Sequence, residues 1–171
     1  QFTQWHKKAT LKGKTDIFFS MKGKYIASQN LSPDIYFKMK VRDGYVGYKG
    51  VPAPAEHLYL NVETSLPSLD VNKVGVKLDS IYFTIGKEYF SGILNLNGIN
   101  PPVIDAKVRA NINVANVMHL LDMKDLEVKG ILLADIKSKG TYAPEQKLFP
   151  ITKGDLEFSE GYVKTPYYPN P

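Results

Sequence analysis

Hydrophobic and polar residues alternate along most of the chain, and the pattern is clearest at residues 103–114. The even positions of this segment carry Ala106, Val108, Ala110, Ile112 and Val114. The odd positions between them carry Asp, Lys, Arg and Asn. Because successive side chains of a β-strand point to opposite faces of a sheet, the pattern predicts a half-buried strand with one apolar face.

A second strand of the same design is predicted at residues 126–139. Its apolar positions are Leu126, Val128, Leu132 and Ile136. Charged residues hold most of the alternate positions, but Ile131 and Leu133 interrupt them, so both faces of the strand are apolar there. We therefore expect another element to cover the second face at this point.

Between these two strands the hydrophobic period changes to that of a helix. Residues at i, i+3, i+4 and i+7 form one apolar stripe: Val114, Val117, Met118 and Leu121. Asn113 is a suitable N-cap, and the helix is expected to end near residues 123–124. A helix of about nine residues is marginal alone. It should pack on the sheet, and it is the candidate cover for Ile131 and Leu133.

Further alternating segments predict more strands, at residues 34–41, 45–50, 57–64, 72–86 and 89–98, and near the ends at 15–23 and 154–163. Asp43-Gly44 and Gly86-Lys87 are expected to form hairpin turns. Proline-rich stretches separate several of the strands. The fold class is therefore mainly β: one antiparallel sheet of about eight to ten strands with one short helix, in a single domain over residues 1–171.

Strands with one apolar and one polar face are compatible with two architectures. A closed β-sandwich buries the apolar faces of two sheets against each other. A single, strongly curved sheet leaves a concave apolar groove instead. Periodicity alone does not separate them, and we expect the single curved sheet.

Composition narrows the function classes. The chain has 171 residues, 43% of them hydrophobic, and it has no cysteine, which excludes disulfides and thiolate zinc sites. The formal net charge of +5 comes from lysines scattered along strands, which is typical of a solvated face and argues against nucleic-acid binding. No apolar run approaches the roughly 18 residues needed for a transmembrane helix.

Candidate catalytic chemistry is sparse. The histidines are far apart in sequence, with no ligand at metal-binding spacing: His6, His57 and His119. No phosphate-binding glycine loop and no G-x-S-x-G motif is present. We therefore expect no enzymatic activity, no cofactor and no metal. The aromatic residues suit strand packing, although an enzyme or a sugar-binding domain remains a further hypothesis.

Two segments resemble a known family. Residues 40–63, "KVRDGYVGYKGVPAPAEHLYLNVE", are similar to a strand–Gly-Tyr–strand–Pro–strand passage of AsmA-family proteins, especially Bacteroides-like versions. Residues 89–143, from "YFSGILNLNG" to "KGTYA", resemble the strand, short helix and strand of that family's C-terminal conserved region. The resemblance covers residues 32–166 and rests on segment order.

The resemblance implies a role in the bacterial envelope. The chain would be an excised periplasmic segment, tethered to the inner membrane by an N-terminal helix outside this sequence. AsmA-like proteins are linked to phospholipid transport and outer-membrane assembly through long β-sheet grooves. The implied partners are a phospholipid or another envelope lipid, the membrane and other envelope proteins, and no nucleic acid.

The candidate lipid-groove residues are the apolar positions of the two clearest strands. They are Ala106, Val108, Ala110, Ile112, Leu126, Val128, Leu132 and Ile136. The alternative for each is ordinary core beneath a second layer, and the small Ala106 and Ala110 suit either a roomy groove or close helix packing. The alternative function is a β-sandwich scaffold or adhesion-type module of the envelope with no lipid groove.

Overall fold

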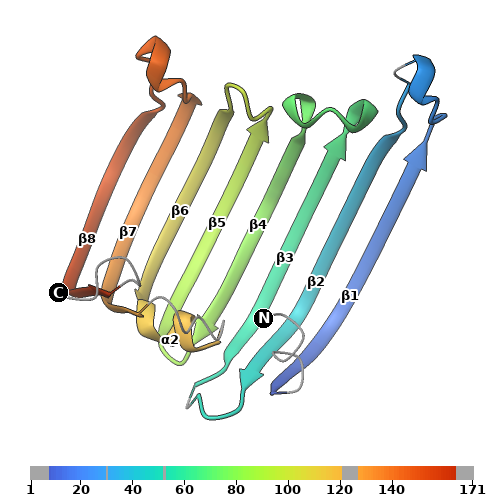
Figure 1. The fold of residues 1–171 in the computed structure, drawn as a ribbon. Helices are drawn as coiled ribbons and strands as arrows, with labels where there is room; N and C mark the ends of the chain where they lie inside the picture. The colour runs from blue at the N-terminus through green and yellow to red at the C-terminus, as the bar shows by residue number, and fades with distance from the viewer. Residues whose placement is uncertain (1–7, 30, 52, 121–126, 165–171) are drawn as a thin grey trace.

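One open antiparallel sheet of eight strands makes up most of the structure (Figure 1). The computed structural model describes residues 8–29, 31–51, 53–120 and 127–164. The strands are β1 (Ala9–Lys22), β2 (Asp34–Tyr48), β3 (Ala55–Leu66), β4 (Gly75–Ile85), β5 (Glu88–Asn97), β6 (Val103–Asn113), β7 (Glu127–Thr141) and β8 (Ile151–Lys164). Each strand pairs with its neighbours in sequence. The expected mainly-β fold with one antiparallel sheet is confirmed.

The sheet does not close. Its order runs from β1 to β8, and within the described residues no strand lies outside either of these two edges. A closed sandwich would need two sheets facing each other, whereas all eight strands belong to the same sheet. The single-sheet architecture expected from the sequence is therefore the one observed.

One of the two expected hairpin turns is present and the other is absent. The Gly86-Lys87 turn joins β4 to β5 as predicted, with Gly86 at φ 61°. The predicted turn at Asp43-Gly44 is wrong, because β2 runs through it to Tyr48. Asp43 has φ 51° at a register shift between β2 and β3, which is a β-bulge. A positive φ serves a bulge as well as a hairpin turn, so the dipeptide alone did not distinguish them.

Cross-strand register collects apolar side chains on one side of the sheet. A continuous row crosses six strands: Ile17, Met39, Val62, Leu78, Leu94 and Ala106. We call the side that carries this row the apolar face and the opposite side the polar face. The alternation of β4 shifts by one residue between Leu78 and Ile81, where a bulge keeps both residues on the apolar face.

A short helix, α2 (Val114–Leu120), packs on one end of the apolar face. Leu120 joins a buried cluster with Ala55, Ile85, Ala110 and Ile112. Asn113 is the N-cap as predicted, because its Oδ1 accepts a hydrogen bond of 3.1 Å from the Ala115 backbone N–H. The predicted stripe residue Leu121 and the predicted helix end lie outside the described residues.

The expectation that this helix covers Ile131 and Leu133 is wrong. Both side chains lie on the polar face, and each is 37% exposed. The helix instead packs beside Leu132 and Ala134, which point to the apolar face. The reason is the apolar area on each face. A helix buries more apolar area at the end of the apolar face than it would by covering two isolated residues on the polar face.

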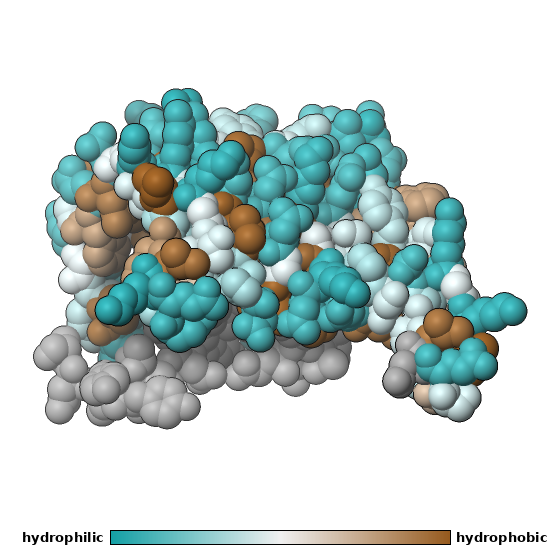
Figure 2. Space-filling view, turned by 90° about the horizontal axis from the view of Figure 1, so that it is seen from above, coloured by the Kyte–Doolittle hydropathy of each residue, from teal (hydrophilic) through white to brown (hydrophobic). Residues whose placement is uncertain are grey.

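The molecule exposes an unusually large surface. Its solvent-accessible area is 11891 Å². A compact monomer of 19.2 kDa is expected to expose about 8,400 Å². A single sheet without a second layer over most of it exposes both of its faces and contributes to this excess. Seen from above, hydrophobic residues are visible among the hydrophilic ones that dominate this view (Figure 2).

Candidate functional site: the apolar face

The structure brings the predicted groove residues together. Seven of the eight lie in β6 and β7, and Leu126 lies outside the described residues. All seven point to the apolar face, where Val108 lies opposite Ile136 and Ile112 lies opposite Leu132. The alternation of the two strands therefore predicted their common face correctly.

The seven residues divide into a covered and an uncovered group. Ala110 and Ile112 are each 3% exposed and belong to the cluster beneath α2, against which Leu132 also packs. Of the two roles that suit the small size of Ala110, a roomy groove and close helix packing, the structure shows helix packing. Val128 lies at the end of β7 that is nearer to α2, and it is half-buried. Ala106, Val108 and Ile136 lie farther along the strands, outside that cluster, and are half-buried.

The apolar face extends beyond the predicted residues to both edges of the sheet. On β1 its side chains include Ile17, Phe19 and Met21, and on β8 they include Leu156. Their exposed fractions lie between 59% and 64%. Both segments were predicted as strands, but their residues were not among the predicted groove residues. The available signal was their alternation in "TDIFFSMK" and "GDLEF".

Two complete cross-strand rows show the character of this surface. One continues from Ala106 through Ser138 to Thr152 on β8. The next runs through Thr15, Val41, Leu60, Ile81, Gly92, Val108, Ile136 and Gly154. Neither row contains a charged residue. With strands about 4.8 Å apart, each row forms an uncharged path of about 34 Å across the sheet.

One carboxylate fixes the helix-covered end of the face. Glu88, at the start of β5, accepts a hydrogen bond of 3.0 Å from the Asn113 backbone N–H. Its two oxygens also accept from the Asn116 side-chain amide at 3.2 Å. A negative charge at a helix N-terminus is favourable. Glu88 could not be predicted from local sequence, because its partners are 25 and 28 positions away.

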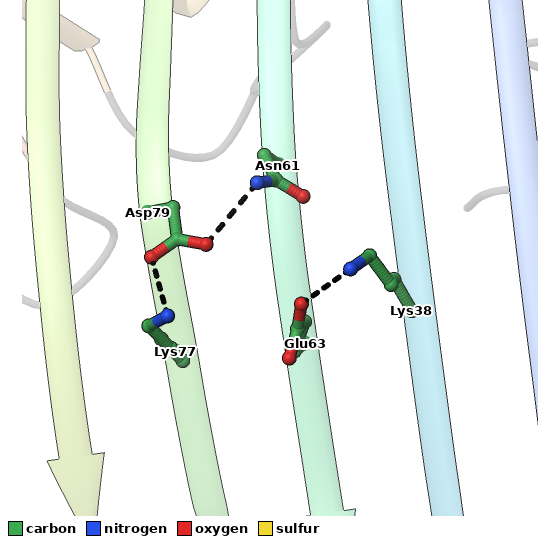
Figure 3. A network of polar contacts seen from close by, with 5 residues as sticks. All are labelled: Lys38, Asn61, Glu63, Lys77 and Asp79. Atoms are coloured by element: carbon green, nitrogen blue, oxygen red, sulfur yellow. Dashed lines mark hydrogen bonds and ion pairs between the residues drawn. The ribbon is translucent and has the colours of Figure 1, made fainter.

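The polar face carries ionised side chains that pair with one another (Figure 3). Lys38 Nζ lies 2.6 Å from Glu63 Oε1, and Lys77 Nζ lies 2.9 Å from Asp79 Oδ1. Asn61 donates a hydrogen bond of 3.1 Å to Asp79. These pairs join β2, β3 and β4 at the surface.

The pairing shifts the pKa values away from neutrality. Hydrogen bonds from Lys38 and then from Tyr36 lower the pKa of Glu63. The hydrogen bond to Glu63 raises the pKa of Lys38, and that to Asp79 raises the pKa of Lys77. All three groups therefore stay charged around neutral pH. This network is suited to holding strands together in water and offers no poised proton donor or acceptor.

The described residues contain no conventional small-molecule or metal site. A shallow hollow of about 220 Å³ lies beside Gly75, lined by residues such as Tyr36, Glu63 and Asn97. Ligand pockets usually have about 300–1,000 Å³. No group of three potential ligands gathers in the described part of the chain. Among the helices of that part, none is long and apolar enough to span a membrane.

Comparisons of the chain with protein-family models, with curated proteins and with solved structures found no match.

Proposed function

We propose that the apolar face binds acyl chains of an envelope lipid. The chain would act as a periplasmic module of an AsmA-like protein, taking part in phospholipid transport and outer-membrane assembly. The observation that carries the proposal is the pair of uncharged rows that cross the open sheet from β1 to β8 through Ala106 and Val108. An acyl chain has no polar group to pair and requires only a continuous apolar surface.

The free energy of burying an acyl chain on this face favours reversible binding of lipid. Burying a CH₂ group contributes about 0.8 kcal/mol. An open sheet contacts one side of an acyl chain, so roughly half of that value is available per group, less than a bilayer provides. Such a surface can receive lipid from a membrane and return it to another one. A closed cavity would hold its lipid more tightly.

The family resemblance supports the same role. The two segments that resemble AsmA-family proteins, residues 40–63 and 89–143, supply most of β2, β3 and β5–β7 together with α2. They therefore contribute the middle of the apolar face. Membership of the family, the periplasmic location and a tether to the inner membrane are parts of the proposal.

The test is the Val108→Asp variant. Val108 lies in an uncharged row outside the cluster beneath α2. A carboxylate there would have no partner and would oppose an acyl chain. We expect phospholipid to co-purify with the wild-type chain without detergent, measured by native mass spectrometry, and to be lost from the variant.

Lys107→Asp is the matched control. It introduces the same side chain one position away, on the polar face of the same strand. We expect it to retain lipid. A wild-type chain that carries no lipid and excludes hydrophobic dyes would contradict the proposal and favour the scaffold function. Equal lipid loss in both variants would show that the effect comes from charge or folding and not from the face.

A further inference from the structure

The two edges of the sheet are complementary in direction. Because eight is an even number of antiparallel strands, β1 and β8 run in opposite directions. A second copy placed beside the first by translation therefore sets its β1 antiparallel to β8 of the first copy. Both apolar faces then lie on the same side. Each of these strands has 14 residues, so neither edge is too short to pair.

Three charged residues on the polar face of β8, Lys153, Asp155 and Glu157, have no ion pair within the described residues. Two of them lie opposite a like charge on β7, because Lys153 faces Lys137 and Asp155 faces Asp135. Like charges directly opposite one another are destabilising. Asp135 is already paired with Arg109, at 3.0 Å. Glu157 lies opposite Leu133. The outer edge thus presents a Lys–Asp–Glu series with no intramolecular ion pair.

Strand β1 carries the complementary series. Its polar-face residues Lys12, Lys14 and Asp16 follow at the same spacing of two. Lys14 has no ion pair among the described residues, and Lys12 lies over the Tyr45 ring, 5.2 Å from its centroid. Asp16 pairs with Arg42 on β2 and remains exposed.

One antiparallel register satisfies all of these charges at once. It sets Lys12 opposite Glu157, Lys14 opposite Asp155 and Asp16 opposite Lys153. The same register sets Phe18 opposite Ile151, two apolar residues on the polar face that are 56% and 71% exposed. On the apolar face it sets Leu11 opposite Phe158. Pairing of β1 with another β1, or of β8 with another β8, yields no register with three opposite-charge pairs.

We infer that β8 of one copy pairs with β1 of a second copy of this chain, head to tail, in this register. The pairing satisfies the free backbone groups of both edges, which are otherwise a template for uncontrolled association. It also continues the apolar face from one copy into the next. Since such an interface is heterologous and does not close on two copies, larger oligomers form as the concentration rises.

Sedimentation velocity of the chain at increasing concentration tests the inference. We expect the average mass to rise above 19.2 kDa in steps of one chain at low salt. It should fall back at about 1 M salt, where the Debye length is about 3 Å. Lys14→Glu and Asp155→Lys should each raise the concentration for half-association roughly fivefold, because an attractive pair becomes repulsive.

The double variant Lys14→Glu/Asp155→Lys should restore association, since it exchanges the two charges across the interface. Lys107→Glu is the control, because it makes the same charge change in the middle of the sheet. A single 19.2 kDa species at every concentration would overturn the inference. Association that becomes stronger with salt would also overturn the inference, and so would association that neither single variant changes. In both cases the cause would be contact between apolar faces.

Discussion

At the scale of single residues, the polar face determines how stability depends on pH. The pKa of Glu63 is lowered from 4.5 in the folded state, so the folded protein binds fewer protons than the unfolded chain just below that pH. Asp70 and Glu127 are shifted in the same direction, by the Asn72 backbone N–H and by Lys129. Their stabilising contribution is complete above about pH 4.5 and is lost as the pH falls through the folded-state values. The pKa of Lys38 is raised in the folded state, so its contribution to stability is complete below about pH 10.5 and is lost as the pH rises further.

We therefore expect the urea midpoint of the wild-type chain to be flat around neutral pH and to fall below about pH 4.5. Glu63→Gln should lower the midpoint at neutral pH and make the acid side less steep. Glu145→Gln, which neutralises an exposed carboxylate that has no ion pair in the described structure, is the control and should leave the midpoint at neutral pH unchanged. An identical slope in wild type and Glu63→Gln would contradict the assignment.

At the scale of elements, α2 depends on tertiary contacts because it has seven residues. A helix of this length does not persist alone in water. Glu88 holds its first turn through Asn113 and Asn116. Glu88→Ala leaves a backbone donor without its partner and removes the favourable charge, so we expect a loss of about 1–2 kcal/mol in the free energy of unfolding. The measurement is urea unfolding, with the exposed Glu145→Ala as the matched control. A loss no larger than that of the control would contradict this role for Glu88.

The elements also show how far sequence could predict this fold. Period-two alternation identified the strands and the common face of Val108 and Ile136, because side-chain direction in a strand is a local property. The bulge at Asp43 was missed, since a positive φ is compatible with both a turn and a bulge until the pairing partner is known. The face chosen by α2 and the role of Glu88 depend on contacts between distant residues. The exposed edges were missed as part of the site, because whether a strand lies at an edge depends on the whole sheet.

At the scale of the whole molecule, the open sheet should leave a signature in unfolding. The unfolded chain of 19.2 kDa exposes about 27,800 Å², so unfolding from 11891 Å² uncovers about 15,900 Å². A compact protein of this mass would uncover about 19,400 Å². The denaturant slope m is proportional to the area exposed, and we expect about four-fifths of the value usual for this chain length. Urea unfolding of dilute protein at about 1 M salt, where edge pairing is screened, measures it. A full-sized slope would mean that another layer covers the apolar face in solution, and acyl chains would then have no open surface to bind.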